Sequence, residues 1–107
     1  MFVYAFSLVK VHDGDTVHVD VDCGFHVHYR TKIRFLGINC PELATPAGKV
    51  ARDYTAAWFA ATTTPLTVAV AGPDKYGDRW DGTITRGGDP VSLNAALLAS
   101  GNAAKSP

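Results

Sequence analysis

The sequence predicts a domain of the α+β class, in which a five-stranded Greek-key barrel carries two helices. Two observations point to the strands: apolar and polar residues alternate in several short segments, and turn-forming residues separate these segments. A third points to the helices, because apolar residues recur at helical spacing elsewhere in the chain. Together they give three strands, a helix, two strands and a second helix.

The strands are predicted from alternation and from the turns between them. In the second strand, Val17, Val19 and Val21 share one face, while polar residues take the other. An Asp-Gly turn precedes this strand, and a loop of turn-forming residues, 71–78, separates the last two strands. The five predicted strands cover residues 2–11, 16–22, 27–36, 66–70 and 80–85. The segment 39–42 between the third strand and the first helix is predicted to be irregular, because its proline removes a hydrogen-bond donor.

The first helix is predicted to begin at Thr45 and Pro46, with threonine as the cap and proline at the first helical position. Its apolar stripe, which we expect to face the core, consists of Ala47, Val50, Ala51, Tyr54 and Trp58. The second helix covers residues 92–100 and ends at Gly101, which suits a left-handed cap. This order of elements is typical of the OB-fold, a small five-stranded barrel.

Length and composition favour one compact domain, residues 1–107, that buries roughly two-thirds of the surface exposed by the unfolded chain. Hydrophobic residues make up 47% and charged residues 19%, which excludes a disordered or fibrous protein. The formal net charge is zero, which argues against sequence-independent wrapping of duplex DNA. Any contact with nucleic acid is therefore expected to be local.

The chain shows no targeting or membrane signal. The apolar segment 1–9 is too short to span a bilayer and is read as the first strand, so we expect no membrane contact and favour a cytoplasmic location. Cys23 and Cys40 lack a CxxC spacing, which gives no zinc signature. Free thiols are the main interpretation and a single disulfide is the alternative. The histidines, of which His26 and His28 are predicted to share a strand face, are read as exposed polar residues rather than metal ligands.

Side chains suited to a metal lie at the ends of predicted strands. Asp15 and Asn39 offer hard oxygen ligands, which with a backbone carbonyl and waters could hold one calcium-sized cation. The structural alternative for the Asp-Gly-Asp segment is an ordinary solvated turn. The polar residues are concentrated in three separate segments, 13–16, 34–42 and 74–79.

Side chains suited to a phosphate occur in the same segments. Arg34 and Arg79 offer planar donors that match phosphate oxygens in pairs, and Glu42 is the only glutamate of the chain. A cation and two guanidinium groups would offset the charge that develops on a phosphodiester, while a carboxylate deprotonates a water. These residue types therefore predict hydrolysis of a phosphodiester.

Four blocks also carry a family resemblance. The blocks are Asp13-Gly-Asp-Thr16, Arg34-Phe-Leu-Gly-Ile-Asn-Cys-Pro-Glu42, Asp74-Lys-Tyr-Gly-Asp-Arg79 and Leu93-Asn-Ala-Ala-Leu-Leu-Ala-Ser-Gly101. In order and spacing they resemble the staphylococcal nuclease (thermonuclease) family, and the similarity extends over nearly the whole chain. The resemblance implies a calcium-dependent endonuclease on an OB-fold barrel, which acts on single-stranded DNA and RNA and leaves 3′-phosphate ends.

By position, the resemblance implies metal ligands for one Ca²⁺. Asp15 and Asn39 look like the side-chain ligands, and Cys40 looks like the residue that contributes its backbone carbonyl. The family usually has an aspartate where this chain has Asn39. The amide keeps a carbonyl oxygen but removes one negative charge, so we expect weaker calcium binding.

The resemblance also implies catalytic and substrate-binding residues. Arg34 and Arg79 look like the phosphate clamps, and Glu42 looks like the general base or the group that orients the water. Lys75 and Tyr76 resemble residues that contact the nucleotide.

Two further departures from the family bear on substrate and partners. Asp78 stands between Gly77 and Arg79, where the family more often has arginine directly after Tyr-Gly. We interpret it as a one-residue insertion that weakens substrate binding. Longer members continue beyond the second helix, so we expect exposed apolar surface here that a homodimer or a partner protein covers.

Two other functions are compatible with these residues. One is a catalytically weak or inactive OB-fold module that binds nucleic acid but has lost hydrolysis through Asn39, and the other is a protein-interaction scaffold. The presence of Arg34, Glu42 and Arg79 together favours the enzyme, because a scaffold has no physical need for that set.

Overall fold

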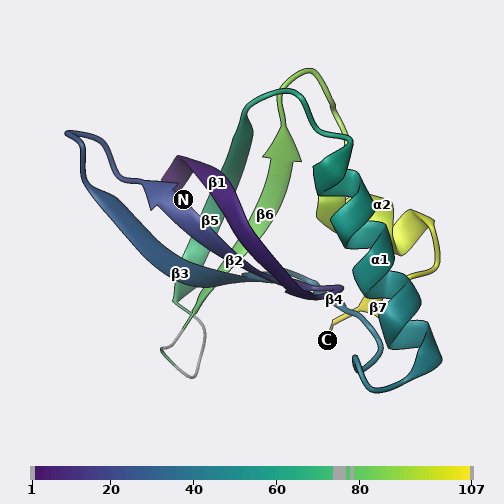
Figure 1. The fold of residues 1–107 in the computed structure, drawn as a ribbon. Coiled ribbons are helices and arrows are strands. Elements are labelled where there is room, and N and C mark those ends of the chain that lie inside the picture. Colours follow the sequence, from purple (N-terminus) through teal and green to yellow (C-terminus); the bar gives the residue numbers. More distant parts are fainter. Residues whose placement is uncertain (1, 74–76, 78, 107) are drawn as a thin grey trace.

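The computed structural model describes residues 2–73, 77 and 79–106, and within them it shows a closed five-stranded barrel with two helices (Figure 1). The barrel strands are β1 (Phe2–Asp13), β2 (Thr16–Asp22), β3 (His28–Phe35), β5 (Leu66–Pro73) and β6 (Trp80–Arg86). They neighbour one another in the order β1-β2-β3-β6-β5, and β5 pairs with β1 to close the barrel. Only β3 and β6 run parallel among these pairs. The predicted α+β class with an OB-type barrel is confirmed.

The two helices, α1 (Pro46–Ala60) and α2 (Leu93–Ala99), lie together on one side of the barrel (Figure 1). Helix α1 packs against β1 and α2, and α2 packs against β6. Helix α1 begins with the predicted cap, because the Thr45 hydroxyl accepts from the Gly48 amide. Helix α2 begins one residue later than predicted, because Ser92 is its cap and accepts from the Ala95 amide. Gly101 follows α2 with a φ of 79°, the left-handed conformation expected there.

The buried face of α1 differs from the predicted stripe. Val50 is 58% exposed and Ala47 is also exposed, so both were wrongly assigned to the core. The residues of α1 that are buried are Gly48, Ala51, Thr55, Trp58 and Phe59. The rotation of the helix follows from Gly48, because a Cβ there would lie 1.8 Å from the Glu42 carbonyl oxygen. The helix thus turns its glycine toward the preceding loop and Val50 toward solvent.

The strands also differ from the prediction at several points. Strand β5 continues through Pro73 instead of ending at residue 70, and its register against β6 shifts between Val70 and Gly72. Strand β3 begins at His28 because Phe25 and His26 have positive φ angles, which end the extended backbone. His26 therefore does not share a strand face with His28. The segment 39–42, predicted to be irregular, contributes to a small ladder in which β4 (Ile38–Asn39) pairs with β7 (Ala104–Lys105).

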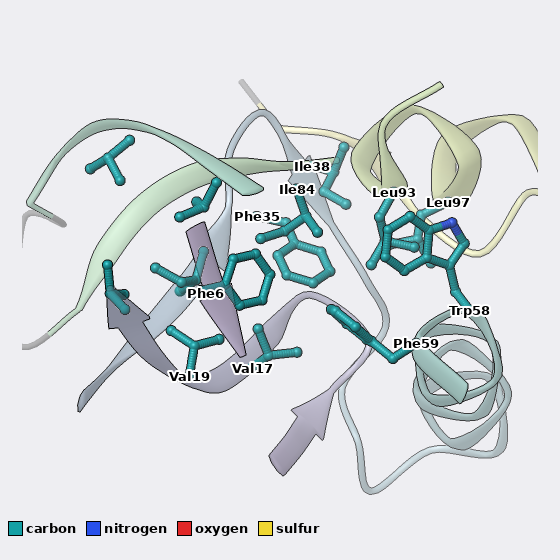
Figure 2. Close-up of a cluster of buried hydrophobic side chains, with 14 residues drawn as sticks. Phe6, Val17, Val19, Phe35, Ile38, Trp58, Phe59, Ile84, Leu93 and Leu97 are labelled. Atoms are coloured by element: carbon teal, nitrogen blue, oxygen red, sulfur yellow. The ribbon is translucent and has the colours of Figure 1, made fainter. Parts of the chain in front are cut away.

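The core fills the barrel and continues under the helices (Figure 2). Alternation along β2 turns Val17, Val19 and Val21 inward as predicted, and each is at most 1% exposed. Fully buried Leu93 and Leu97 of α2 close the end of this cluster. No helix within the described part of the chain is long and apolar enough to cross a membrane. Both cysteines are free thiols, so the disulfide alternative is not realised.

Candidate active site

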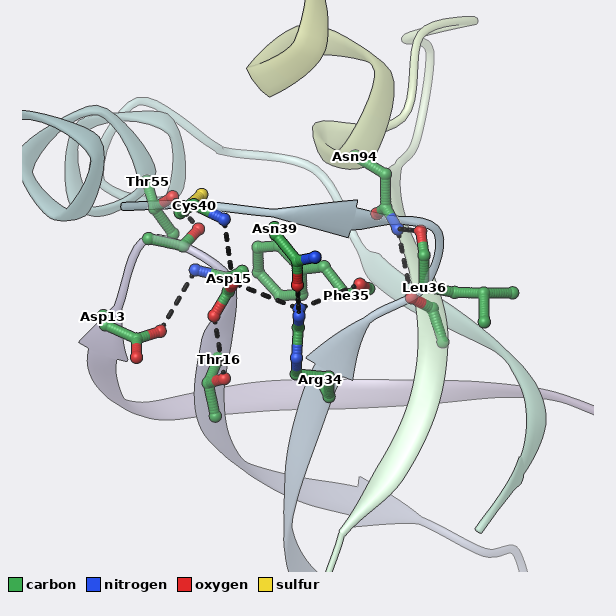
Figure 3. Close-up of polar contacts among 12 residues, drawn as sticks. Asp13, Asp15, Thr16, Arg34, Phe35, Leu36, Asn39, Cys40, Thr55 and Asn94 are labelled. Carbon is green, nitrogen blue, oxygen red and sulfur yellow. Dashed lines mark hydrogen bonds and ion pairs between the residues drawn. The ribbon is translucent and has the colours of Figure 1, made fainter. Parts of the chain in front are cut away.

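The carboxylate of Asp15 is the centre of a polar cluster at the turn between β1 and β2 (Figure 3). The residue is 8% exposed and its oxygens accept from three directions. Arg34 Nη1 lies 3.1 Å and the Cys40 amide nitrogen 3.0 Å from Oδ2, while the Thr16 hydroxyl lies 3.2 Å from Oδ1. Segments that are separate in the sequence therefore meet at one carboxylate.

The backbone around Asp15 is held by several contacts that fix the direction of its side chain. Its amide donates to Asp13 Oδ1 over 3.1 Å, and its carbonyl accepts from the Phe35 amide over 2.8 Å. The Thr55 hydroxyl of α1 donates to the Gly14 carbonyl over 2.7 Å. Gly14 allows this approach, because a Cβ there would lie 2.8 Å from the Ala51 Cβ atom. The turn is thereby fixed between β3 and α1.

Arg34 connects the cluster to the loop that follows β3. Its side chain leaves the outer face of the strand, where Arg34 pairs in register with Thr16. In addition to the ion pair with Asp15, the guanidinium donates to the Phe35 carbonyl over 3.3 Å and to Asn39 Oδ1. One planar guanidinium thus joins the carboxylate and amide oxygens that the sequence predicts as metal ligands.

The thiol of Cys40 is protonated at neutral pH. Burial raises its pKa to about 12, and the carboxylates of Asp15 and Asp13 add to this effect. A protonated thiol is a poor metal ligand, which leaves the backbone as the part of Cys40 suited to coordination. The pKa of Asp13 is raised, first by burial and then by its hydrogen bond and charge interaction with Asp15. Negative charge is therefore concentrated in this turn.

The remaining predicted residues lie on the loop after Cys40, directly before β6, or outside the described residues. Glu42 is exposed two residues beyond Cys40, and its carbonyl accepts from the Thr45 hydroxyl over 2.7 Å, which ties its loop to the cap of α1. Arg79 directly precedes β6, whose first residue is opposite Ile33 of β3. It therefore lies beside the strand that carries Arg34. Of the predicted substrate-binding pair, both Lys75 and Tyr76 lie outside the described residues, as does the Asp78 insertion.

Three members of the cluster, Asp13, Thr16 and Thr55, were not among the predicted metal, catalytic or substrate-binding residues. Asp13 accepts from the amide two residues ahead, a local pattern of aspartate in turns that its position before Gly14 could have indicated. Thr55 lies on a helix distant in sequence, and no local signal predicts its hydrogen bond to Gly14.

The donor set of this cluster fits a hard divalent cation. Asp15, Asn39 and the Cys40 carbonyl supply only oxygen atoms, the donors that calcium prefers. Asp15 and Asn39 bind the same guanidinium, so their oxygens lie within reach of one small group. Among the described residues there is no group of three or more His, Cys, Asp or Glu side chains that could hold a metal ion. A cation between these oxygens requires Arg34 to move away from at least one of them.

A comparison with models of known protein families finds no match to the chain, and neither does a comparison with curated proteins. The function is therefore argued from the chemistry of the cluster and from the resemblance of the four sequence blocks.

Proposed function

We propose that this protein is a calcium-dependent endonuclease of the staphylococcal nuclease type, which hydrolyses phosphodiester bonds of single-stranded DNA and RNA. The contact of Asp15 with Arg34 and with the Cys40 amide carries the proposal. It joins the first two sequence blocks in one cluster at the end of an OB-type barrel. The parallel pairing of β3 with β6 places Trp80, which directly follows the third block in the sequence, opposite Ile33.

Arg34 is suited to bind the substrate phosphate because its present partners can be exchanged. A phosphodiester offers two anionic oxygens to a guanidinium, a geometry that matches better than the neutral Asn39 amide oxygen. When Arg34 turns to a phosphate, the Asn39 oxygen becomes available for a cation. Binding of substrate and of cation would then favour each other, because each replaces an interaction that Arg34 otherwise makes.

Glu42 is suited to act on water because its carboxylate is exposed on a loop that is anchored at both ends. Cys40 holds one end through its amide, and Thr45 holds the other. Glu42 takes a proton from the attacking water, the water oxygen bonds to phosphorus, and the P–O5′ bond breaks as the leaving O5′ takes a proton from solvent. The products are a 3′-phosphate and a 5′-hydroxyl. When bound, calcium would supply positive charge to the phosphoryl oxygens.

The test compares degradation of heat-denatured DNA and of RNA in calcium and in chelator. We expect degradation only with calcium, and Glu42→Gln should lower its rate by about 100-fold or more, the usual effect of losing a general base. Asp53→Asn is the matched control, because Asp53 is an exposed carboxylate of α1 whose partner is the neighbouring Arg52. Full activity of Glu42→Gln, or degradation in chelator, would contradict the proposal.

A second function, an OB-fold module that binds nucleic acid without cutting it, is favoured by one observation. The ion pair of Asp15 with Arg34 leaves these two residues without net charge, and Asn39 adds none. A cation therefore finds little electrostatic attraction from this pair. Binding of single-stranded nucleic acid without degradation at high calcium would support this module. If the protein neither binds nor degrades nucleic acid, this result would support the protein-interaction scaffold.

A further inference from the structure

Basic residues gather on the outer face of three adjacent barrel strands, beside the candidate active site. Lys10 of β1 pairs in register with His18 of β2, and His18 pairs with Lys32 of β3. The ring of His12 lies 5.8 Å from that of His18. We call Lys10, His12, His18 and Lys32 the basic row. On β2, the residues on either side of His18, Val17 and Val19, face the core, so His18 and the rest of the row face outward.

A protonated His18 would lie directly opposite a lysine on each neighbouring strand. Like charges at directly opposed positions of a sheet destabilise it, so this arrangement disfavours the charged form of His18. The pKa of His18 is lowered, first by burial and then by the charges of His12, Lys32 and Lys10, which shows that these charges add up at one place. The chain as a whole has no net charge, so the concentration of positive charge is local. An anion bound to the row would relieve this repulsion.

One carboxylate on the same face, that of Asp20, lies against basic residues outside the row. Asp20 follows His18 on the outer side of β2, and its oxygens lie 3.0 Å from His28 Nδ1 and 3.9 Å from Arg30 Nε. Asp20 thus offsets charge beyond the row, on the side away from Asp15. The positive potential at His18 comes from both neighbouring strands, through Lys10 and His12 on one side and Lys32 on the other.

Two residues of the basic row, His18 and Lys32, line a hollow beside strands β2 and β3. The hollow has a volume of about 320 Å³, and its lining includes Val9, His18, Arg30 and Lys32. Arg34, Lys32 and Arg30 occupy alternate positions of β3 and so lie on one face, about 7 Å apart along the strand. A chain of phosphates held by Arg34 therefore meets Lys32 and His18 next if it follows β3.

We propose that the basic row binds the phosphate backbone of single-stranded nucleic acid as the strand extends from the candidate active site. The identity of the strand rests on the proposed function, whereas binding at the row requires no hydrolysis. A flexible single strand can follow a hollow on a curved barrel. A rigid duplex would need positive charge over a wider surface, and the neutral chain does not favour this.

The first test measures the affinity for a fluorescein-labelled oligothymidylate in chelator. We expect the double variant Lys10→Gln, Lys32→Gln to bind about tenfold more weakly or worse. The slope of log K against log salt should fall in magnitude by roughly 1.4, because each lost phosphate contact to a single strand contributes about 0.7. Lys49→Gln, which removes an exposed lysine of α1, is the control and should leave affinity and slope unchanged. Unchanged binding by the double variant would overturn the proposal.

The second test follows the ring protons of His18 by NMR as pH is varied. A bound phosphate offsets the charges of Lys10, His12 and Lys32, so the oligothymidylate should raise the pKa of His18. A thymidine dinucleotide, too short to extend from Arg34 across the row, should leave it unchanged. A purely structural role for the basic row predicts no shift with either ligand, and that result would contradict the proposal.

The two proposals fail separately. If the protein does not hydrolyse nucleic acid, but the double variant loses oligothymidylate binding, the binding role of the basic row is supported and the nuclease proposal is contradicted. If the dinucleotide is cleaved and the double variant binds the oligothymidylate as wild type does, the nuclease proposal is supported and the role of the basic row is contradicted. Phosphatidylserine vesicles provide another source of phosphate, and binding of vesicles through the row without binding of the oligothymidylate would also overturn the proposal.

Discussion

At the scale of single residues, the chemistry of the site depends on which groups share the Asp15 carboxylate. A guanidinium, a backbone amide and a hydroxyl all donate to it, so its two oxygens are well satisfied in a nearly buried position. Such a carboxylate is rigidly placed, and Arg34 is the only one of these three partners that carries charge. In the proposed calcium site, Arg34 and the cation compete for Asp15 and Asn39, and this competition would lower the affinity for calcium.

Replacing Asn39 by aspartate tests this competition directly. We expect Asn39→Asp to tighten calcium binding at least tenfold without nucleic acid, because two unit charges 4 Å apart interact by about 4 kcal/mol at an effective dielectric constant of 20. Isothermal titration calorimetry measures the change. Asn39→Ala removes the oxygen and should weaken binding. An equal affinity of all three proteins would show that Asn39 does not contact the cation.

Sequence reasoning selected candidate metal ligands but not the interactions that they make in the structure. Asp15 and Asn39 could be selected because their residue types and neighbours are informative over a few positions. The ion pair between Asp15 and Arg34 could not be predicted, because it depends on the pairing of Thr16 with Arg34 across β2 and β3. The hydrogen bond from Thr55 to Gly14 depends on the rotation of α1, which the sequence pattern assigned incorrectly.

At the scale of secondary-structure elements, two polar connections fix the helices to the barrel. Asn94 of α2 is 6% exposed and makes three hydrogen bonds with backbone of the barrel side. Its amide nitrogen donates to the Leu36 and Gly82 carbonyls over 3.0 and 3.2 Å, and its oxygen accepts from the Ile84 amide over 3.1 Å. A buried asparagine therefore acts as a link that no apolar residue can replace.

Asn94→Leu should destabilise the protein by about 2–4 kcal/mol, because it leaves the buried Ile84 amide and two carbonyls without this partner. Urea unfolding followed by circular dichroism measures the loss. Asn102→Leu is the control, since the Asn102 side chain bonds only to the Ser100 hydroxyl in an exposed position. If both variants were equally stable, the link would have no energetic role.

Arg86 makes the second connection, from the end of β6 to the end of α1. Its guanidinium lies 4.3 Å from the centre of the Trp58 ring and donates to the Trp58 carbonyl and the Thr62 hydroxyl. Asp89 orients it by accepting from Arg86 Nε over 2.9 Å. The pKa of Asp89 is lowered, first by its hydrogen bond from the Val91 amide and then by Arg86.

This lowered pKa predicts how stability depends on pH. Ionised Asp89 stabilises the fold at pH values above its ordinary pKa of 3.8, and this contribution is lost as the pH falls through the lower value of the folded state. Asp89→Asn should therefore lower the melting temperature at pH 7, and the difference from wild type should shrink as the pH falls below 3.8. Asp53→Asn, at an exposed position of α1, should show no such convergence. A difference that is constant with pH would contradict this assignment.

At the scale of the whole molecule, the candidate site borders the core. The core residues line the barrel and the inner sides of the helices, and one of them, Phe35, donates its amide to the Asp15 carbonyl. Cys40 also packs against the core. Because burial of this apolar core stabilises the fold, we expect the protein to fold without a cation.

Removal of calcium should leave the fold intact but lower its melting temperature. A cation at one hundred times its dissociation constant stabilises the native state by about 2.7 kcal/mol. We expect calcium to raise the melting temperature of wild type and of Glu42→Gln, but not of Asp15→Asn, with the same far-ultraviolet circular dichroism in chelator. Stabilisation of Asp15→Asn by calcium would place the cation elsewhere.

The architecture was more predictable than its details. Alternation over residues 16–22 and the cap at Thr45 act over a few positions, and these elements formed as expected. The ladder between β4 and β7 joins residues distant in sequence, and two short segments carry too little pattern to predict it. The continuation of β5 past residue 70 depends likewise on its partner β6.

One irregularity in β1 decides which side chains can meet a ligand. Leu8 pairs with Val19 and Lys10 pairs with His18, so Val9 is an additional residue without a counterpart on β2. Before it, even-numbered residues such as Phe6 point inward, and after it Val11 does so instead. The additional residue keeps the Lys10 ammonium group outside the barrel, because in an unbroken strand Val9 would take the outward position and Lys10 would point into the interior. A deletion of Val9 leaves Lys10 directly after Leu8 and opposite His18 as before, so it should be tolerated far better than a deletion of Val11, which would turn His12 toward the core.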